Sequence, residues 1–156
     1  MPDELSLQER LAPQSMCFGC GSMNPDGLHL QSHADAAGEL TADWTPSARH
    51  DAFPGVLNGG VIGALLDCHS NWTAVIHLMR ERGLDGPPGV VTADFHVKLR
   101  KPTPTDRPVH LRAWVVAAEG DRITVDSELS SDGTVTASCR ATLVAVRPEH
   151  PAYHRW

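Results

Sequence analysis

Hydrophobic residues recur at steps of three and four between residues 58 and 82, and this spacing predicts one long helix. Asn58 is a good N-cap for it, and Gly83, Gly86 and two prolines end the pattern. A stripe of small and polar residues runs along the same helix: Gly60, Gly63, Asp67, Ser70, Asn71 and Ala74. Because a carboxylate is costly to bury in so apolar a helix, we expect Asp67 to face a cleft or a partner.

The chain after this helix predicts four β-strands. Residues 89–100 alternate strictly, with hydrophobic side chains on one face and Thr92 among the polar side chains of the outward face. Three further strands are expected at 107–118, 122–131 and 134–147, separated by turns at 119–121 and 131–133. The order of these segments predicts an antiparallel meander.

Weaker patterns precede the long helix. They predict a short helix at 3–12, strands at 27–33 and 39–45 around a turn at 35–38, and a loop at 46–57. One long apolar helix among antiparallel strands predicts the α+β class, with the sheet wrapped around the helix. Without a repeat or a linker, residues 1–156 are expected to form one domain, in which 1–24 is an N-terminal extension with a Cys-x-x-Cys turn.

Composition excludes several classes of protein. Hydrophobic residues make up 41% of the chain and charged residues 21%, which is typical of a globular protein. Because the net charge is −6, nucleic acid is not an expected partner. No run of residues is apolar and long enough to span a membrane, and the N-terminus is too charged for a signal peptide. We therefore expect a cytoplasmic location.

The four cysteines are too few and too scattered for a secreted disulfide framework. Only Cys17 and Cys20 form a motif, in the segment CFGCGSMNPDGLHL. This pair could form a redox pair or supply half of a zinc site, which His29 or His33 would have to complete. A turn rich in Gly and Pro explains the motif without a metal, and we favour that interpretation.

The start of the long helix has the outline of an oxyanion site. Gly59 and Gly60 leave the first backbone N–H groups accessible, and the helix dipole favours negative charge there. The run GVLNGGVIGALLD, with an extended run around Thr92 downstream, resembles the hotdog-fold acyl-CoA thioesterases of the PaaI and THEM type. Their helix usually opens with His-Gly-Gly and carries an acidic residue eight positions after the first of those glycines. Many relatives also share the Cys-x-x-Cys-Gly and Asn-Pro-x-Gly-Leu entry.

The matching residues indicate what the resemblance implies for function. Gly59 and Asp67 keep the eight-residue interval, whereas Asn58 stands where the family has histidine. The resemblance implies hydrolysis of an acyl- or aryl-CoA to free acid and coenzyme A, without a cofactor other than the coenzyme A of the substrate. The Gly59 amide, together with that of Gly60, would hold the oxyanion, and Asp67 would act as general base or as nucleophile. Thr92 matches a serine that, in THEM-type relatives, helps to position the water.

The distance between two of these residues predicts an oligomer. Eight helical residues rise about 12 Å, whereas Gly59 and Asp67 would each have to lie within about 3 Å of the reacting carbonyl. Both can act on one thioester only if they come from two chains. We therefore expect a homodimer with shared active sites, an arrangement that the resemblance also implies. Whether dimers pair into tetramers stays open.

Further candidates for substrate contacts lie on either side of Asp67. Asn71 follows it by one helical turn and could hydrogen-bond the Asp67 carboxylate or the substrate, and His50 lies in the loop that leads to the helix. Three basic residues cluster at the end of the first long strand: Lys98, Arg100 and Lys101. They suit the phosphates of coenzyme A, and a charged sheet edge that prevents aggregation is the alternative. His69 points away from Asp67 and is expected in the core or an interface.

Two alternatives to a thioesterase stay open. A hotdog acyl-CoA hydratase relies on an Asp and His pair, and the histidine before the glycines is absent here. The second is a non-catalytic acyl-CoA binding or sensor protein, in which Asn58 replaces that histidine without loss of binding. Nucleotide hydrolysis and a nicotinamide cofactor are not expected, because the chain has neither a Walker loop nor a Gly-x-Gly-x-x-Gly run.

Overall fold

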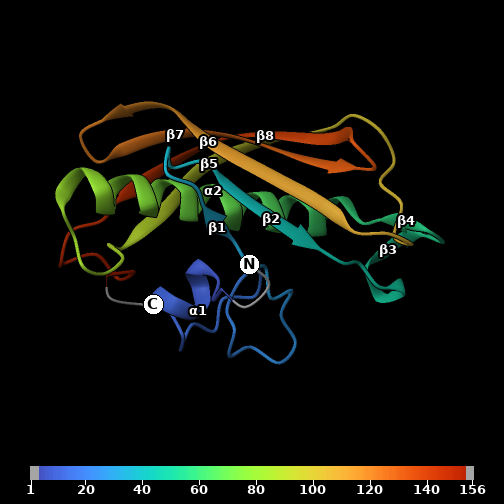
Figure 1. Cartoon of the computed structure of the whole chain (residues 1–156), viewed down its shortest axis with the longest axis horizontal. Helices are drawn as coiled ribbons and strands as arrows, with labels where there is room; N and C mark the ends of the chain where they lie inside the picture. The colour runs from blue at the N-terminus through green and yellow to red at the C-terminus, as the bar shows by residue number, and fades with distance from the viewer. Residues whose placement is uncertain (1–3, 154–156) are drawn as a thin grey trace.

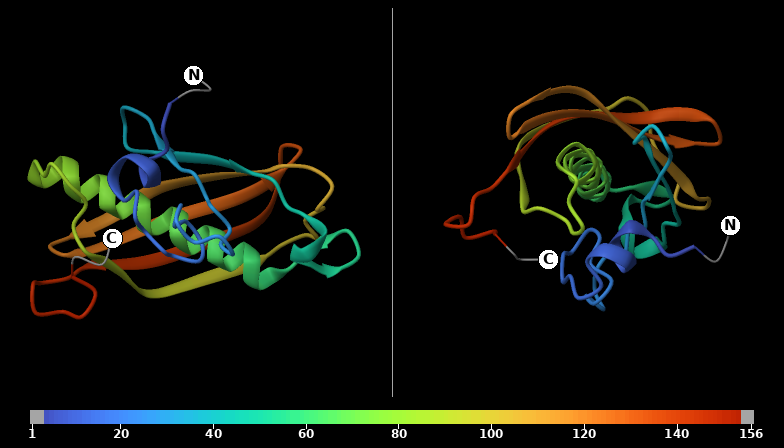
Figure 2. Two further views of the ribbon diagram at one scale, coloured as in Figure 1. Left: turned by 90° about the horizontal axis from the view of Figure 1, so that it is seen from below. Right: turned by 60° about the vertical axis from the view of Figure 1, so that its left-hand side comes forward.

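A computed structural model describes residues 4–153 and consists of one long helix under a curved six-stranded sheet (Figure 1). In chain order the elements are α1 (Leu7–Leu11), β1 (His33–Ala34), β2 (Leu40–Trp44), the 3-10 helix η1 (Ala48–His50), β3 (Asp51–Phe53), β4 (Val56–Leu57), α2 (Gly59–Arg82), β5 (Val90–Leu99), β6 (Val109–Glu119), β7 (Arg122–Ser131) and β8 (Thr134–Ala145). Seen along α2, the sheet wraps around the helix, and the N-terminal segment lies on the other side (Figure 2). This is the predicted hotdog fold.

The long helix α2 begins and ends where the sequence predicts. The side-chain oxygen of Asn58 accepts hydrogen bonds from the backbone N–H groups of Gly60 and Val61, at 2.8 and 3.2 Å. Gly83 adopts a left-handed conformation with φ of 62° and ends the helix. The helix buries a set of large hydrophobic side chains in the core: Ile62, Leu65, Leu66, Trp72, Val75 and Ile76. Within residues 4–153, no helix has the length and apolar character needed to cross a membrane.

The sheet has the strand order β1-β2-β6-β7-β8-β5, with antiparallel neighbours throughout. Strands β6, β7 and β8 form the predicted meander, and Gly120, Asp132 and Gly133 supply the positive φ angles of its turns. Strand β5 pairs with β8, which leaves its other edge without a partner strand among the described residues. The longest edge strand therefore lies beside α2 at one side of the sheet.

The chain before α2 differs from the prediction at three places. Strand β1 has only two residues, because Leu28 and Leu30 donate backbone hydrogen bonds to residues 18 and 19, and His29 has φ of 53°. The predicted helix at 3–12 is limited to α1, which starts after the cap Ser6; residue 3 lies outside the described residues. The predicted loop at 46–57 contains η1 and the short antiparallel pair β3–β4.

The predicted outward orientation of Thr92 is wrong. The pairing of β5 with β8 shifts register between Thr92 and Asp94, and this irregularity turns Thr92 toward α2. Phe95 and Leu99, further along β5, stay 45% and 58% exposed at the unpaired edge. Because the residue types alternate strictly along β5, the sequence gives no sign of the local change in which side chains face α2.

Candidate functional site

Asp67 is the ninth of the 24 residues of α2 and points toward the first residues of β5. The Thr92 hydroxyl donates a hydrogen bond of 2.7 Å to Oδ1 of Asp67, and Oδ2 has no hydrogen-bond partner within residues 4–153. The carboxyl is half-buried, and its desolvation raises the pKa of Asp67, although the bond from Thr92 acts in the opposite direction. A carboxylate held at one oxygen and free at the other can accept a proton from water.

Asn71 does not support this carboxylate. Its side-chain amide donates a 3.1 Å hydrogen bond to the backbone carbonyl of Val90, at the start of β5. The expected contact with Asp67 is therefore wrong. Asn71 instead fastens α2 to the edge strand one turn beyond Asp67, which helps to keep Thr92 within reach of the carboxylate.

Gly59 is the first residue of α2, and its N–H has no acceptor in the described part of the chain. The next two amides are not available, because Asn58 caps both Gly60 and Val61. This corrects the expectation that Gly60 adds a second oxyanion donor. Gly59 also lies close to β5, since a Cβ on it would lie 2.8 Å from Cδ1 of Leu99, the flexible end of a largely exposed side chain. One free amide therefore points outward at the positive end of the helix dipole.

A hollow of about 430 Å³ adjoins this free amide. Its walls are largely apolar and come from β3, β4, α2 and the end of β5: Ala52, Phe53, Val56, Leu57, Gly59, Ile62, Leu99 and Pro102. Arg100 and Lys101 also line it, so two of the three basic candidates lie beside Gly59. Asp67 is not part of this lining, in agreement with its place two helical turns away.

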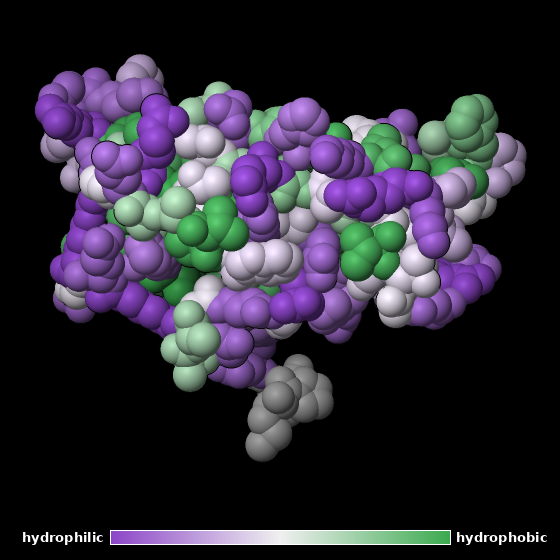
Figure 3. All heavy atoms as spheres, turned by 90° about the horizontal axis from the view of Figure 1, so that it is seen from above, coloured by the Kyte–Doolittle hydropathy of each residue, from purple (hydrophilic) through white to green (hydrophobic). Residues whose placement is uncertain are grey.

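Lys98 lies on the other face of the sheet, which corrects the expectation of a single basic cluster. It lines a hollow of about 790 Å³ together with Asp94, His96 and Arg140, and Arg100 borders both hollows. Hydrophilic side chains cover most of this outer face (Figure 3). Because the sheet separates it from α2, this hollow contains neither Asp67 nor Gly59.

His50 positions the start of α2 through its backbone rather than its ring. Its carbonyl accepts a 2.9 Å hydrogen bond from the N–H of Asn58, whereas its Nδ1 accepts one of 3.1 Å from the N–H of Ser47. The ring packs against Trp44 with centroids 4.9 Å apart, and burial lowers the pKa of His50. Since the ring is not among the residues that line the hollow, the expected substrate contact of His50 is not supported.

Comparison with known protein families identifies the family of this chain. The family model of the thioesterase superfamily matches residues 54–138, which is more than half of the chain and includes α2 and β5. The chain belongs to the thioesterase superfamily. A search of curated proteins gave no match. Membership agrees with the resemblance that the glycines and Asp67 carry.

Several solved structures share the fold of this chain. A crystal structure of one thioesterase superfamily protein has a TM-score of 0.68 at 21% identity; the match covers 81% of this chain and 61% of that chain, less than two thirds of its length. A thioesterase superfamily protein from Shewanella loihica has a TM-score of 0.63 at 26% identity, and the match covers 76% of this chain and 91% of that chain. The E. coli PaaI protein from the phenylacetic acid degradation operon has a TM-score of 0.66 at 13% identity, and the match covers 77% of this chain and 81% of that chain.

His69 belongs to the core of this superfamily member, as the sequence predicts. It is fully buried, and its two ring nitrogens lie 2.9 Å from Oγ of Ser32 and 3.0 Å from the carbonyl oxygen of Leu40. Burial lowers the pKa of His69 to about 4. The imidazole is therefore neutral at pH 7, and it fixes α2 to β2 away from Asp67.

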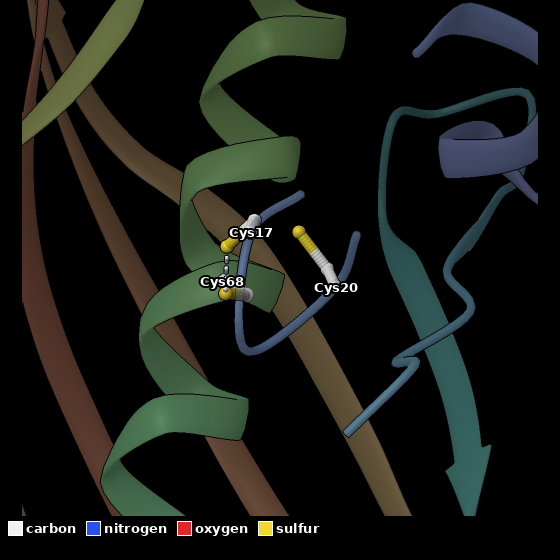
Figure 4. Close-up of side chains that lie close together, drawn as sticks. All are labelled: Cys17, Cys20 and Cys68. Carbon is white, nitrogen blue, oxygen red and sulfur yellow. Dashed lines mark hydrogen bonds between the residues drawn. The ribbon is translucent and has the colours of Figure 1, made fainter. Parts of the chain in front are cut away.

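Cys17 and Cys20 form the predicted turn, but a third cysteine meets them. The sulfurs of Cys17, Cys20 and Cys68 all lie within 4.8 Å of one another, and Figure 4 shows them pointing together from the N-terminal segment and from α2. Hydrogen bonds from the other two thiols lower the pKa of Cys17. His29, expected as a completing ligand, instead bonds to the backbone carbonyl of Asn24. Sequence spacing could not reveal Cys68, which lies 51 residues after Cys17.

Proposed function

We propose that the protein hydrolyses the thioester of an acyl- or aryl-coenzyme A to the free acid and coenzyme A. One observation carries this proposal: Gly59, whose amide is free, and the Asp67 carboxylate lie against opposite ends of the unpaired edge strand β5. Gly59 lies against Leu99, and Asp67 lies against Thr92. Membership in the thioesterase superfamily supports the reaction class.

The unpaired edge of β5 supports a dimer in which the two groups meet. An edge of ten residues with exposed Phe95 and Leu99 is a ready template for pairing with another strand. If two copies of β5 pair antiparallel about their centre, Leu99 of one chain lies opposite Val90 of the other, and Thr92 lies opposite Val97. This pairing carries Asp67 of one chain toward Gly59 of its partner. Within one chain, about 12 Å of helix separates Gly59 from Asp67. Pairing along β5 spans this distance by bringing in the second group from the other chain.

In this dimer the two groups have complementary tasks. The Gly59 N–H donates to the thioester carbonyl oxygen and stabilises the negative charge that develops there. Asp67 from the other chain either takes a proton from the attacking water or attacks the carbonyl carbon itself. Thr92 holds one carboxylate oxygen, so the second oxygen faces the water or the substrate. Both routes release the thiol of coenzyme A; in the second, the acyl group forms a mixed anhydride with Asp67, which water then hydrolyses to the free acid.

The hollow beside Gly59 is the proposed substrate contact on the first chain. Its apolar wall, with Phe53, Ile62 and Leu99, suits an acyl chain or the pantetheine arm. Arg100 and Lys101 at the same hollow provide positive charge for the phosphates of coenzyme A. Coenzyme A is then part of the substrate, and the chemistry requires no separate cofactor.

The test is release of free thiol from a panel of short, long and aromatic acyl-CoAs. We expect turnover with at least one of them, and Asp67→Asn to lower kcat/KM by about 10²- to 10⁴-fold, the range typical of a lost acid–base group. Asp94→Asn is the matched control, because Asp94 lies on the outer face of the same strand. Tight acyl-CoA binding without thiol release would favour a binding protein, and hydration of an enoyl-CoA without thiol release would favour a hydratase.

A further inference from the structure

The cluster of three cysteines lies outside the proposed reaction and is built from two distant parts of the chain. Cys17 and Cys20 come from the N-terminal segment, and Cys68 comes from α2 (Figure 4). All three are free thiols, of which Cys17 is exposed, Cys68 is half-buried and Cys20 is buried. Converging sulfurs of this kind suit either a metal ion or a disulfide, and the distances between them distinguish the two.

The spacing of the sulfurs fits metal ligands better than a disulfide. Sγ of Cys17 lies 3.7 Å from Sγ of Cys68. Thiolates at about 2.3 Å from a tetrahedral zinc ion lie about 3.8 Å apart, because the edge of a tetrahedron is 1.63 times its centre-to-corner distance. A disulfide requires about 2.0 Å and would leave the third sulfur unused. Cys17 and Cys68 therefore already stand at the separation that a shared ion would impose.

The backbone around the cluster is arranged to bring the cysteine turn against α2. A Cβ on Gly19, between the two cysteines of the turn, would lie only 2.3 Å from Sγ of Cys68. Only glycine allows so close an approach. The turn is closed by a 2.8 Å hydrogen bond from the N–H of Gly21 to the carbonyl of Cys17, and Leu30 donates one of 3.0 Å to the carbonyl of Gly19. The sulfurs are thus held together before any ion binds.

We propose that Cys17, Cys20 and Cys68 bind one zinc ion, with a fourth coordination position open to solvent at the exposed Cys17. Each coordinating thiol gives up its proton to solvent, so binding strengthens as the pH rises. The ion links the N-terminal segment to α2 at the residue next to Asp67. The bound ion therefore holds the N-terminal segment against the middle of α2. The proposal does not depend on thioester hydrolysis.

Metal titration of the reduced, chelator-treated protein tests the proposal without measuring activity. Zinc is added in competition with a chromogenic chelator, and cobalt is added separately to report thiolate ligation through sulfur-to-cobalt charge-transfer absorption. We expect one ion of either metal per chain. Cys17→Ser removes an exposed ligand. Loss of a group that only hydrogen-bonds to a metal ligand typically costs about 10- to 100-fold in metal affinity, so loss of a ligand itself should weaken zinc binding by at least that factor.

Two further variants separate a metal site from a mere change in folding. Cys139→Ser removes a buried cysteine of β8 outside the cluster and should bind zinc as the unaltered chain does. Gly19→Ala keeps every sulfur but displaces Cys68, so it should weaken zinc binding while circular dichroism shows a folded protein. The proposal is overturned if the unaltered chain binds no more zinc than Cys17→Ser, or shows no charge-transfer band with cobalt. Reversible loss of two thiols without zinc binding would also overturn it and would identify a redox pair.

Discussion

Thr92→Val removes one hydroxyl from the site and keeps the shape of the side chain. The lost hydrogen bond is 2.7 Å long and ends on the half-buried carboxylate of Asp67. Hydrogen bonds to charged groups contribute about 1.5–3 kcal/mol. At about 1.4 kcal/mol for each factor of ten in rate, losing this contact lowers kcat by at most about 150-fold, because part of the bond already stabilises the charged ground state of Asp67.

The effect should appear in kcat rather than in KM, because Thr92 contacts the acidic group and not the hollow beside Gly59. Steady-state thiol release measures both constants. Thr92→Ser keeps the hydroxyl and should stay within a few-fold of the unaltered chain. Thr124→Val, on the outer face of β7, controls for loss of a threonine hydroxyl elsewhere in the sheet. Full activity in Thr92→Val, or equal losses in the Val and Ser variants, would refute a positioning role for Thr92.

Two predictions concern stability. Because the pKa of His69 is about 4 when folded and near 6.5 when unfolded, the unfolded chain binds more protons between these values. The stability contributed by neutral His69 is complete above pH 6.5 and falls by about 3 kcal/mol toward pH 4. Unfolding free energies from denaturant curves of the unaltered chain and of His69→Gln should therefore converge as the pH falls over this range. A constant difference between the two would contradict this prediction. Asn58→Ala loses the cap on Gly60 and Val61 and should lower the unfolding free energy by about 1 kcal/mol, whereas Asn58→Asp should retain most of it.

The sequence predicts α2 and the strands after it closely, because local signals define them. Asn58 and Gly83 mark the helix ends, and glycine-containing turns separate the last three strands. Before α2 these signals are weak. The segment that contains Leu28 and Leu30 is apolar like a strand, yet its hydrogen bonds go to the cysteine turn, which only the tertiary structure brings close.

The candidate site is predictable where it depends on spacing and not where it depends on contacts across the fold. The interval between Gly59 and Asp67 could be read along one helix. The facing of Thr92 could not, because the irregularity in β5 leaves no mark in the alternation of residue types. The meeting of Cys68 with the N-terminal turn is a similar case, since 51 residues separate it from Cys17.

The central claim is that one chain supplies the Gly59 amide and its partner supplies Asp67. Gly59→Pro removes this N–H at the first helical position, where proline is tolerated, and the preceding Asn58 already has the extended conformation that proline requires. The added ring would meet only the flexible end of Leu99. Asp67→Ala removes the acid.

The most direct test is complementation in heterodimers of Gly59→Pro and Asp67→Ala chains, isolated with two different affinity tags. Each variant alone should be inactive in thiol release. A shared site predicts that the heterodimer recovers about half of the unaltered activity, because one of its two sites combines both intact groups. A heterodimer as inactive as either variant alone would contradict the account.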